Sequence, residues 1–199
     1  MVGIALGIGV VIGLIVGLAL YTTRKGGIYD NRGVYFVLNF VVNFFRPIPF
    51  VIFIGAVQPL ARYVTGTGIG NPAIIFGLSI AAGFFVSRVV EQNLFSVDSG
   101  VVEAARAAGA SRPQVVFGVL IPEALGPLIL GLTFSFVSVV DASAVAGVLG
   151  GGGLGNFALS YGFRQFDTFV TWATVAIIVV LVQFAQLTGN WAARKIMRR

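Results

Sequence analysis

The chain has 199 residues, of which 57% are hydrophobic and 10% are charged, and its formal net charge is +6. Its mean hydropathy of +0.97 and its lack of the roughly 25% charged residues that wet a soluble domain indicate an integral membrane protein. The sequence contains no cysteine and no histidine, which excludes thiolate and imidazole metal ligands, disulfides, cysteine nucleophiles and every triad with a histidine base.

Five apolar segments are long enough to cross a bilayer, whose core requires about 20 residues of helix. They predict an all-α membrane protein with five transmembrane helices. No linker or change of composition divides residues 1–199, so we expect a single membrane domain. The expected spans are 1–22, 40–61, 73–90, 124–149 and 168–187.

The first span carries glycines with repeated four-residue spacing. They are Gly3, Gly7, Gly9, Gly13 and Gly17. Small residues at this spacing let helices approach closely in lipid, so the pattern favours a packed transmembrane helix. A cleaved signal peptide is the alternative, but its positive charges should precede the apolar run, and here they follow it.

The second span contains Arg46, Pro47 and Pro49 near its start. Because proline disrupts a helix interior, we expect an irregular interfacial segment that straightens after Pro49, preceded by an interfacial or partly inserted helix at 34–43. Arg46 has two interpretations. It binds a substrate carboxylate, or it extends to lipid phosphates near the cytoplasmic boundary, and the second is the commoner fate of an arginine.

The longest polar stretch, residues 91–122, separates the third and fourth spans. Asp98 or Ser99 is suited to cap a first short helix, and Gly109 is suited to end it in the left-handed conformation. Ser111 is suited to cap a second short helix. We therefore expect a helix–Gly–helix element that lies flat on the cytoplasmic face and presents small residues to another protein.

Asp141 lies within the fourth span, where a carboxylate costs about 2.5–3.5 kcal/mol on insertion scales. We therefore expect it to face a cavity or a partner, and three roles remain open. Asp141 binds the α-amino group of a substrate, with Ser138 and Ser143 nearby on the helix. Alternatively, it is a hydrated structural residue near the outer end of the span, or it relays protons.

The segment 150–163 begins with four consecutive glycines, which indicates a flexible turn at the outer mouth. The phosphate-binding pattern GxxxxGK(S/T) does not occur in the sequence. We therefore expect that this chain does not hydrolyse ATP and that such energy comes from a partner.

The basic residues predict the orientation of the chain, because cytoplasmic loops carry an excess of lysine and arginine. With the N-terminus outside and the C-terminus inside, only Arg62 and Arg164 face outward, and the other 11 of the 13 basic residues face the cytoplasm. These 11 are Arg24, Lys25, Arg32, Arg46, Arg88, Arg106, Arg112, Arg194, Lys195, Arg198 and Arg199. Since they are distributed between apolar runs rather than clustered, nucleic-acid binding is not indicated.

The polar stretch also carries a spaced motif. Glu103-Ala104-Ala105 is followed after three residues by Gly109, and after nine more by Val119-x-Ile121-Pro122. This pattern resembles the coupling motif of ABC importer permeases, whose loop seats in a cleft of the cytoplasmic ATPase subunit. By this resemblance, the ATPase-coupling residues are Glu103, Ala104, Ala105, Arg106, Gly109, Ala110, Ser111 and Pro122. An ordinary amphipathic loop between spans is the alternative.

Four further segments narrow the resemblance to the permeases of methionine (D-methionine type) importers, which also have five spans and an outer N-terminus. They are NFFRPIPF at 43–50, GTGIG at 66–70, RVVEQNL at 88–94 and GGGGLGNFALSYGF at 150–163. The similarity runs from about residue 14 to the C-terminus, and members of the family carry more residues before the first span, so we expect this N-terminus to be shortened. The family often has Tyr-Ser-Ala-Met where this chain has Asp-Ala-Ser-Ala-Val at 141–145.

The resemblance implies a set of partners and a location. In that family the permease is a homodimer in the bacterial cytoplasmic membrane, with the translocation path at its two-fold axis. Two ATPase subunits bind ATP and magnesium, an extracytoplasmic binding protein delivers the amino acid, and the permease itself holds no cofactor. The candidate residues of the path are Asp141, Ser138, Ser143 and Val145.

Three other functions remain open at this point. An ABC permease for another amino acid or small solute would carry the same loop motif. An ion-gradient carrier would use Asp141 as its proton site, but it leaves the motif unexplained. A membrane-embedded enzyme is disfavoured by the missing histidine and cysteine and by the lack of clustered carboxylates.

Overall fold

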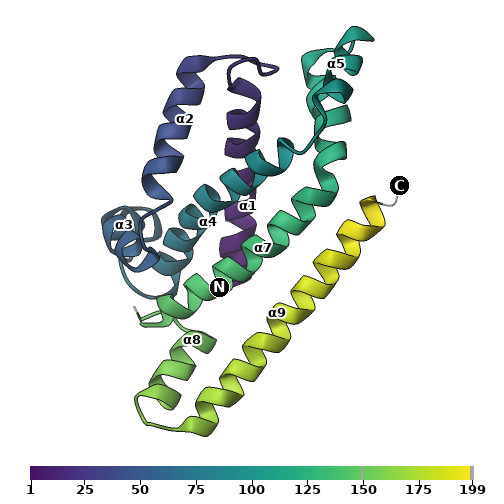
Figure 1. Ribbon diagram of the computed structural model, residues 1–199. Coiled ribbons are helices and arrows are strands. Elements are labelled where there is room, and N and C mark those ends of the chain that lie inside the picture. The colour runs from purple at the N-terminus through teal and green to yellow at the C-terminus, as the bar shows by residue number, and fades with distance from the viewer. Residues whose placement is uncertain (149, 198–199) are drawn as a thin grey trace.

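The computed structural model describes residues 1–148 and 150–197, and within these ranges the chain is all-helical (Figure 1). Parts of two predictions lie outside the described residues, namely Leu149 at the end of the expected fourth span and Arg198 and Arg199 in the C-terminal basic group. The elements are α1 Val2–Thr23, α2 Arg32–Phe45, α3 Phe50–Thr65, α4 Gly70–Leu94, α5 Ser99–Ala107, α6 Arg112–Val115, a π-helical turn Val116–Leu120, α7 Ile121–Val148, α8 Leu154–Phe157, a second π-helical turn Ala158–Phe163, and α9 Thr168–Met197.

Among the described residues, four helical stretches are long and apolar enough to cross a membrane. They are α1, α4, the continuous helix 112–147 and α9, and the bent pair α2 and α3 adds a fifth candidate. The helices that carry the expected third and fifth spans extend beyond them, α4 to Leu94 and α9 to Met197. Polar residues such as Glu91 and Asn190 stay helical at these ends, so the helices continue beyond their most apolar part.

The helices α1 and α4 make the most extensive contact between elements of the described chain. Glycines of α1 allow this approach: a Cβ atom on Gly9 would lie 2.6 Å from the Ala82 Cβ, and one on Gly17 would lie 2.6 Å from the Ser87 carbonyl oxygen. Gly13 lies between them and faces Val86. The packing role predicted for the glycines is confirmed at these three positions, whereas Gly3 and Gly7 face open space.

The expected second span, 40–61, is not one helix. Residues 32–45 form α2, and the break is confined to residues 46–49, where the chain turns by 116° into α3. Pro47 and Pro49 explain the position of the break, because neither has an N–H to donate and each restricts the residue before it. The helix expected at 34–43 is confirmed, and the regular helix after Pro49 is confirmed as α3.

The second short helix of the polar stretch was predicted to lie flat, and this prediction is wrong. The helix instead continues into the fourth span. Ser111 and Gln114 form a capping box at the start of α6, with Pro113 in its first turn, and the helix then runs on through the π-helical turn into α7. This wide turn precedes Pro122, whose ring would clash with the carbonyl group four residues earlier in a regular α-helix.

The glycine-rich segment 150–163 is not simply a flexible turn. After Gly153, which has a φ of 99°, α8 and the second π-helical turn fold back on α7 and α9. The backbone at Gly155 packs on Ala144 and that at Gly147 on Asn156, with no space for a side chain at either glycine. The glycines therefore serve close helix packing as well as the turn.

Candidate functional site

The loop helix α5 is defined at both ends by local hydrogen bonds. At its start, the Asp98 carboxylate accepts a hydrogen bond from the Gly100 N–H at 2.7 Å, so Asp98 rather than Ser99 is the cap. At its end, Gly109 has a φ of 84°. The Gly109 N–H donates a hydrogen bond to the Arg106 carbonyl oxygen at 3.0 Å, and the Ala110 N–H donates one to the Ala105 carbonyl oxygen at 3.1 Å. This pair of bonds is a Schellman motif, which explains the abrupt stop.

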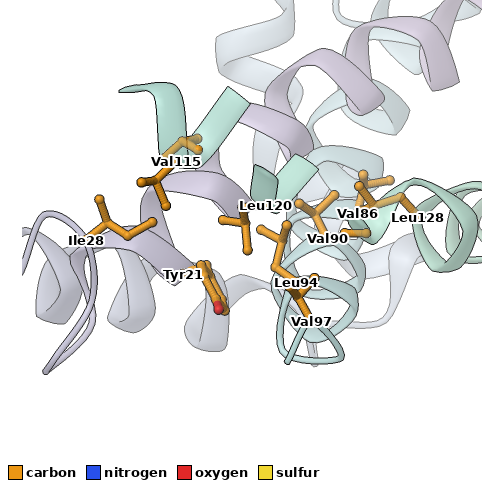
Figure 2. Close-up of a cluster of buried hydrophobic side chains, with 11 residues drawn as sticks. Tyr21, Ile28, Val86, Val90, Leu94, Val97, Val115, Leu120 and Leu128 are labelled. Atoms are coloured by element: carbon orange, nitrogen blue, oxygen red, sulfur yellow. The ribbon is translucent and has the colours of Figure 1, made fainter. Parts of the chain in front are cut away.

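A buried hydrophobic cluster, hereafter the basal cluster, joins residues of α1, α4, α6 and the start of α7 (Figure 2) and packs against α5. Its members are Tyr21, Ile28, Val86, Val90, Leu94, Val97, Val115, Val116, Leu120, Ala124 and Leu128. Val102 and Ala105, on one face of α5, and Ala110 after it are partly buried against this cluster. The position of α5 is therefore coupled to the ends of three long helices.

The opposite face of α5 is exposed. Glu103, Ala104, Arg106, Gly109 and Ser111 all lie on the surface. Their side chains are short apart from Glu103 and Arg106, so the surface has low relief and one charge of each sign.

The structure thus divides the predicted coupling residues into two groups. The five residues above are accessible to a partner, whereas Ala105 and Ala110 are partly buried and connect the surface to the basal cluster. Pro122 is exposed, but it is the second residue of α7 and lies outside the loop helix.

Arginine–aromatic contacts border this end of the molecule. The Arg24 guanidinium lies 4.2 Å from the ring centroids of both Tyr21 and Phe95, and that of Arg112 lies 5.7 Å from the ring of Tyr29. Cation–π contacts of this kind contribute about 0.5–1 kcal/mol each at exposed sites. Sequence reasoning used these arginines only for topology and did not predict their aromatic partners.

The path candidates on α7 do not share one face. Residues of an α-helix are about 100° apart, which places Ser138, Asp141 and Val145 within an arc of about 60° and Ser143 about 140° from Ser138. Asp141 is exposed and has no hydrogen bond or ion pair to the described residues. The Ser143 hydroxyl donates to the Val140 carbonyl oxygen at 2.7 Å, so its own helix satisfies it.

Ser138 lines a cavity of about 160 Å³ beside the break between α2 and α3, hereafter the Arg46 cavity. Arg46 is exposed at this cavity. The other lining residues are Phe45, Ile48, Phe50, Phe53, Leu78, Ala81, Ala82, Phe84, Phe85, Val139 and Ala142. Asp141 and Val145 do not line it, and Ser143 lines a separate apolar cavity of about 390 Å³ between α7, α8, α9 and the start of α1.

A polar cluster that sequence reasoning missed lies between α2 and α4. Arg88 forms an ion pair with Glu91, whose side chain is 5% exposed, and hydrogen bonds with Asn39 and with Asn43, the latter at 2.8 Å. Oppositely charged residues three apart within an apolar helix, together with two asparagines four apart in the preceding segment, were the available signal. The described residues contain no group of three or more acidic side chains that could hold a metal ion.

Known proteins share this architecture. The family described as "Binding-protein-dependent transport system inner membrane component" matches residues 9–198. The chain is 40% identical to the "Probable D-methionine transport system permease protein MetI" of Vibrio cholerae, over 100% of this chain and 88% of that protein. It is 38% identical to the "Methionine import system permease protein MetP" of Bacillus subtilis, over 90% and 81%. It is also similar to a chain of an inward-facing MetNI methionine ABC transporter structure, with a TM-score of 0.94, 38% identity, and coverage of 98% and 91%.

Proposed function

We propose a methionine permease function from one premise: the chain belongs to the family of binding-protein-dependent transport system inner membrane components, which matches residues 9–198. The resemblance that the loop motif indicated is therefore confirmed. The chain is an ABC transporter permease component and a multi-pass protein of the inner membrane, not an enzyme. The methionine assignment follows the names of the relatives in Vibrio cholerae and Bacillus subtilis.

The observation that carries the transport mechanism is the exposed face of α5 above the basal cluster. A cytoplasmic ATPase subunit docks on Glu103, Ala104 and Gly109, and its movement on ATP binding is transmitted through Ala105 to the ends of α1, α4 and α7. ATP and magnesium bind to that subunit, while this chain contributes no catalytic group. Rocking of the helices then alternates access to the path.

A second copy of this chain completes the path. Leu130, Phe134 and Asp141 form an exposed stripe on α7 between the surfaces that pack on α4 and on α9. In a homodimer the two stripes face each other across the two-fold axis, so that Asp141 contacts the path and meets the substrate's amino group. The segment 150–163 lies at the outer mouth, where an external binding protein delivers the amino acid.

The same arrangement supports the proposed orientation. Ile28 in the α1–α2 connection and Val115 in α6 meet in the basal cluster, so the basic residues around them lie at one end of the molecule with α5. Placing this end in the cytoplasm satisfies the excess of basic residues there and puts the N-terminus outside.

The test is methionine uptake by proteoliposomes that contain this chain and its partner ATPase, supplied with the binding protein. ATP-dependent uptake that is lost in Gly109→Trp, together with loss of the two-plus-two complex, is the expected result. ATP-dependent uptake of another solute in place of methionine would make the chain a permease of different specificity. Uptake that follows an ion gradient and needs no nucleotide would replace the proposal with a gradient-driven carrier.

A further inference from the structure

The break that carries Arg46 lies beside the middle of α4 rather than beside one of its ends. The neighbouring Phe45 ring stacks on Phe84 of α4 at a centroid distance of 5.2 Å. At 1.5 Å per residue, Phe84 is about 21 Å along the helix from Gly70 and about 15 Å from Leu94. Because α4 is a candidate membrane span, the break that carries Arg46 lies beside the middle of a span, which favours the interpretation that Arg46 binds a carboxylate over the interpretation that it reaches lipid phosphates.

Arg46, in the break between α2 and α3, and Arg88, in α4, have different surroundings. Arg88 is held by the Glu91 carboxylate and by the amide oxygens of Asn39 and Asn43. Arg46 has no ion pair and no side-chain hydrogen bond within the ranges 1–148 and 150–197. An intramembrane arginine normally pairs with an anion or lines a functional path, and Arg46 borders a cavity. Its position therefore provides a site for an anion that the described chain does not supply.

The remainder of the Arg46 cavity is suited to an apolar side chain. Phe45, Phe50, Phe53, Phe84 and Phe85 line it, and several of these rings contact one another edge to face or in stacks. Thioether sulfur makes favourable contacts with aromatic rings. The volume of about 160 Å³ is similar to the roughly 150 Å³ of an apolar cavity that accepts benzene, which is enough for an unbranched side chain whose charged head remains at the mouth.

We propose that the Arg46 cavity is a substrate site of the permease, in which Arg46 binds the α-carboxylate and the phenylalanine rings contact the thioether side chain. This inference rests on the proposed methionine function and adds the residues that recognise the substrate. Ser138, which lines the same cavity from α7, couples substrate occupancy to the helix that forms the path.

The experiment measures equilibrium binding of radiolabelled L-methionine to the purified permease–ATPase complex in detergent, with methionine amide as competitor. Wild type is compared with Arg46→Gln and Arg46→Lys, and with Arg62→Gln as the matched control, since Arg62 lies in the last turn of α3, away from the Arg46 cavity. A hydrogen bond to a charged group corresponds to an affinity change of about ten- to hundred-fold.

We expect Arg46→Gln to weaken methionine binding by that factor and to remove the preference for methionine over its amide. Arg46→Lys should bind methionine more tightly than Arg46→Gln, and Arg62→Gln should resemble wild type. Unchanged affinity and preference in Arg46→Gln would overturn the inference, and so would the absence of methionine binding to the wild-type complex.

A second measurement uses the wild type alone and tests the inference even if the Arg46 variants fail to assemble. The wild-type complex must bind methionine at least about ten-fold more tightly than methionine amide, and equal binding of the two overturns the inference without any mutation. Uptake by the wild type separates this result from the proposed function. Methionine uptake with no role for Arg46 removes only the cavity assignment, whereas loss of methionine as a substrate of the wild type removes both.

Discussion

Replacing Gly109 by alanine should weaken the binding of the permease to its ATPase, because the backbone conformation at this position is unfavourable for a residue with a side chain. Gly109 has a φ of 84°, and an added Cβ would meet no atom within 4 Å, so the substitution introduces no clash. The left-handed conformation costs a residue with a side chain about 1–2 kcal/mol. If the whole cost acts on the conformation that docks, the affinity for the ATPase falls about 5- to 30-fold.

The control is Gly118→Ala, which makes the same chemical change nearby. Gly118 lies in the π-helical turn, has no positive φ, and also has open space at its Cβ position. The affinity of each variant for the ATPase is measured by titration of the detergent-solubilised permease, and uptake is measured in proteoliposomes. Equal behaviour of Gly109→Ala and Gly118→Ala would refute the reasoning, because the Schellman motif would then contribute nothing to docking.

Three further predictions concern the membrane interior. Gly13→Leu should lower the thermal unfolding temperature of the purified permease, because it overpacks the α1–α4 contact at a cost of about 1–3 kcal/mol. Gly7 faces open space, so Gly7→Leu should leave the unfolding temperature unchanged. Equal unfolding temperatures of the two variants would contradict the packing role of Gly13. Glu91→Ala should destabilise the permease by about 3 kcal/mol in a thermal or denaturant assay, because the largely buried Arg88 would lose its only acidic partner among the described residues and keep only the amide oxygens of Asn39 and Asn43. A change below about 1 kcal/mol would show that the pair is not structural. Asp141→Asn should reduce methionine uptake while co-purification with the ATPase is retained, and unchanged uptake would exclude a role in the path.

Docking and transport are separable in these variants because they involve opposite ends of α7. The start of α7 belongs to the basal cluster through Ala124 and Leu128, whereas Ser138 and Asp141 lie three to five turns further along the helix. A rigid helix transmits displacement between the two ends. The wide π-helical turn before Pro122 is at the junction where the loop joins this helix.

The local features of the fold were predictable from the sequence because local physics decides them. Apolar runs of about 20 residues predict spans, and cap residues predict the ends of short helices, as Asp98, Gly109 and Ser111 show. The separation of Ser143 from Ser138 was also available from helical periodicity. The helices α4 and α9 extend beyond the expected spans because a helix end is set by its packing partners as well as by its hydropathy.

The position of Arg46 could not be predicted in this way. Its neighbours in the sequence, two prolines and a preceding amphipathic segment, are equally compatible with an interfacial location. Only the packing of Phe45 on Phe84 places the break at the middle of α4. The same holds for the polar cluster of Arg88, because its partner Asn39 is 49 residues away in the chain.

The sequence by itself determined that the chain is a helical membrane protein and where its apolar helices lie approximately, and its loop motif resembles that of an ATPase-coupled permease. The membrane class and the helices follow from composition and periodicity along one chain, whereas the function of the loop follows from its resemblance to a known family. Only the tertiary structure decided which face of α5 is exposed, which serine lines the Arg46 cavity, and that Arg88 is held by Glu91, Asn39 and Asn43. Those properties depend on contacts between helices far apart in the sequence, and burial against another element determines whether a given charge is already neutralised or is available to a ligand.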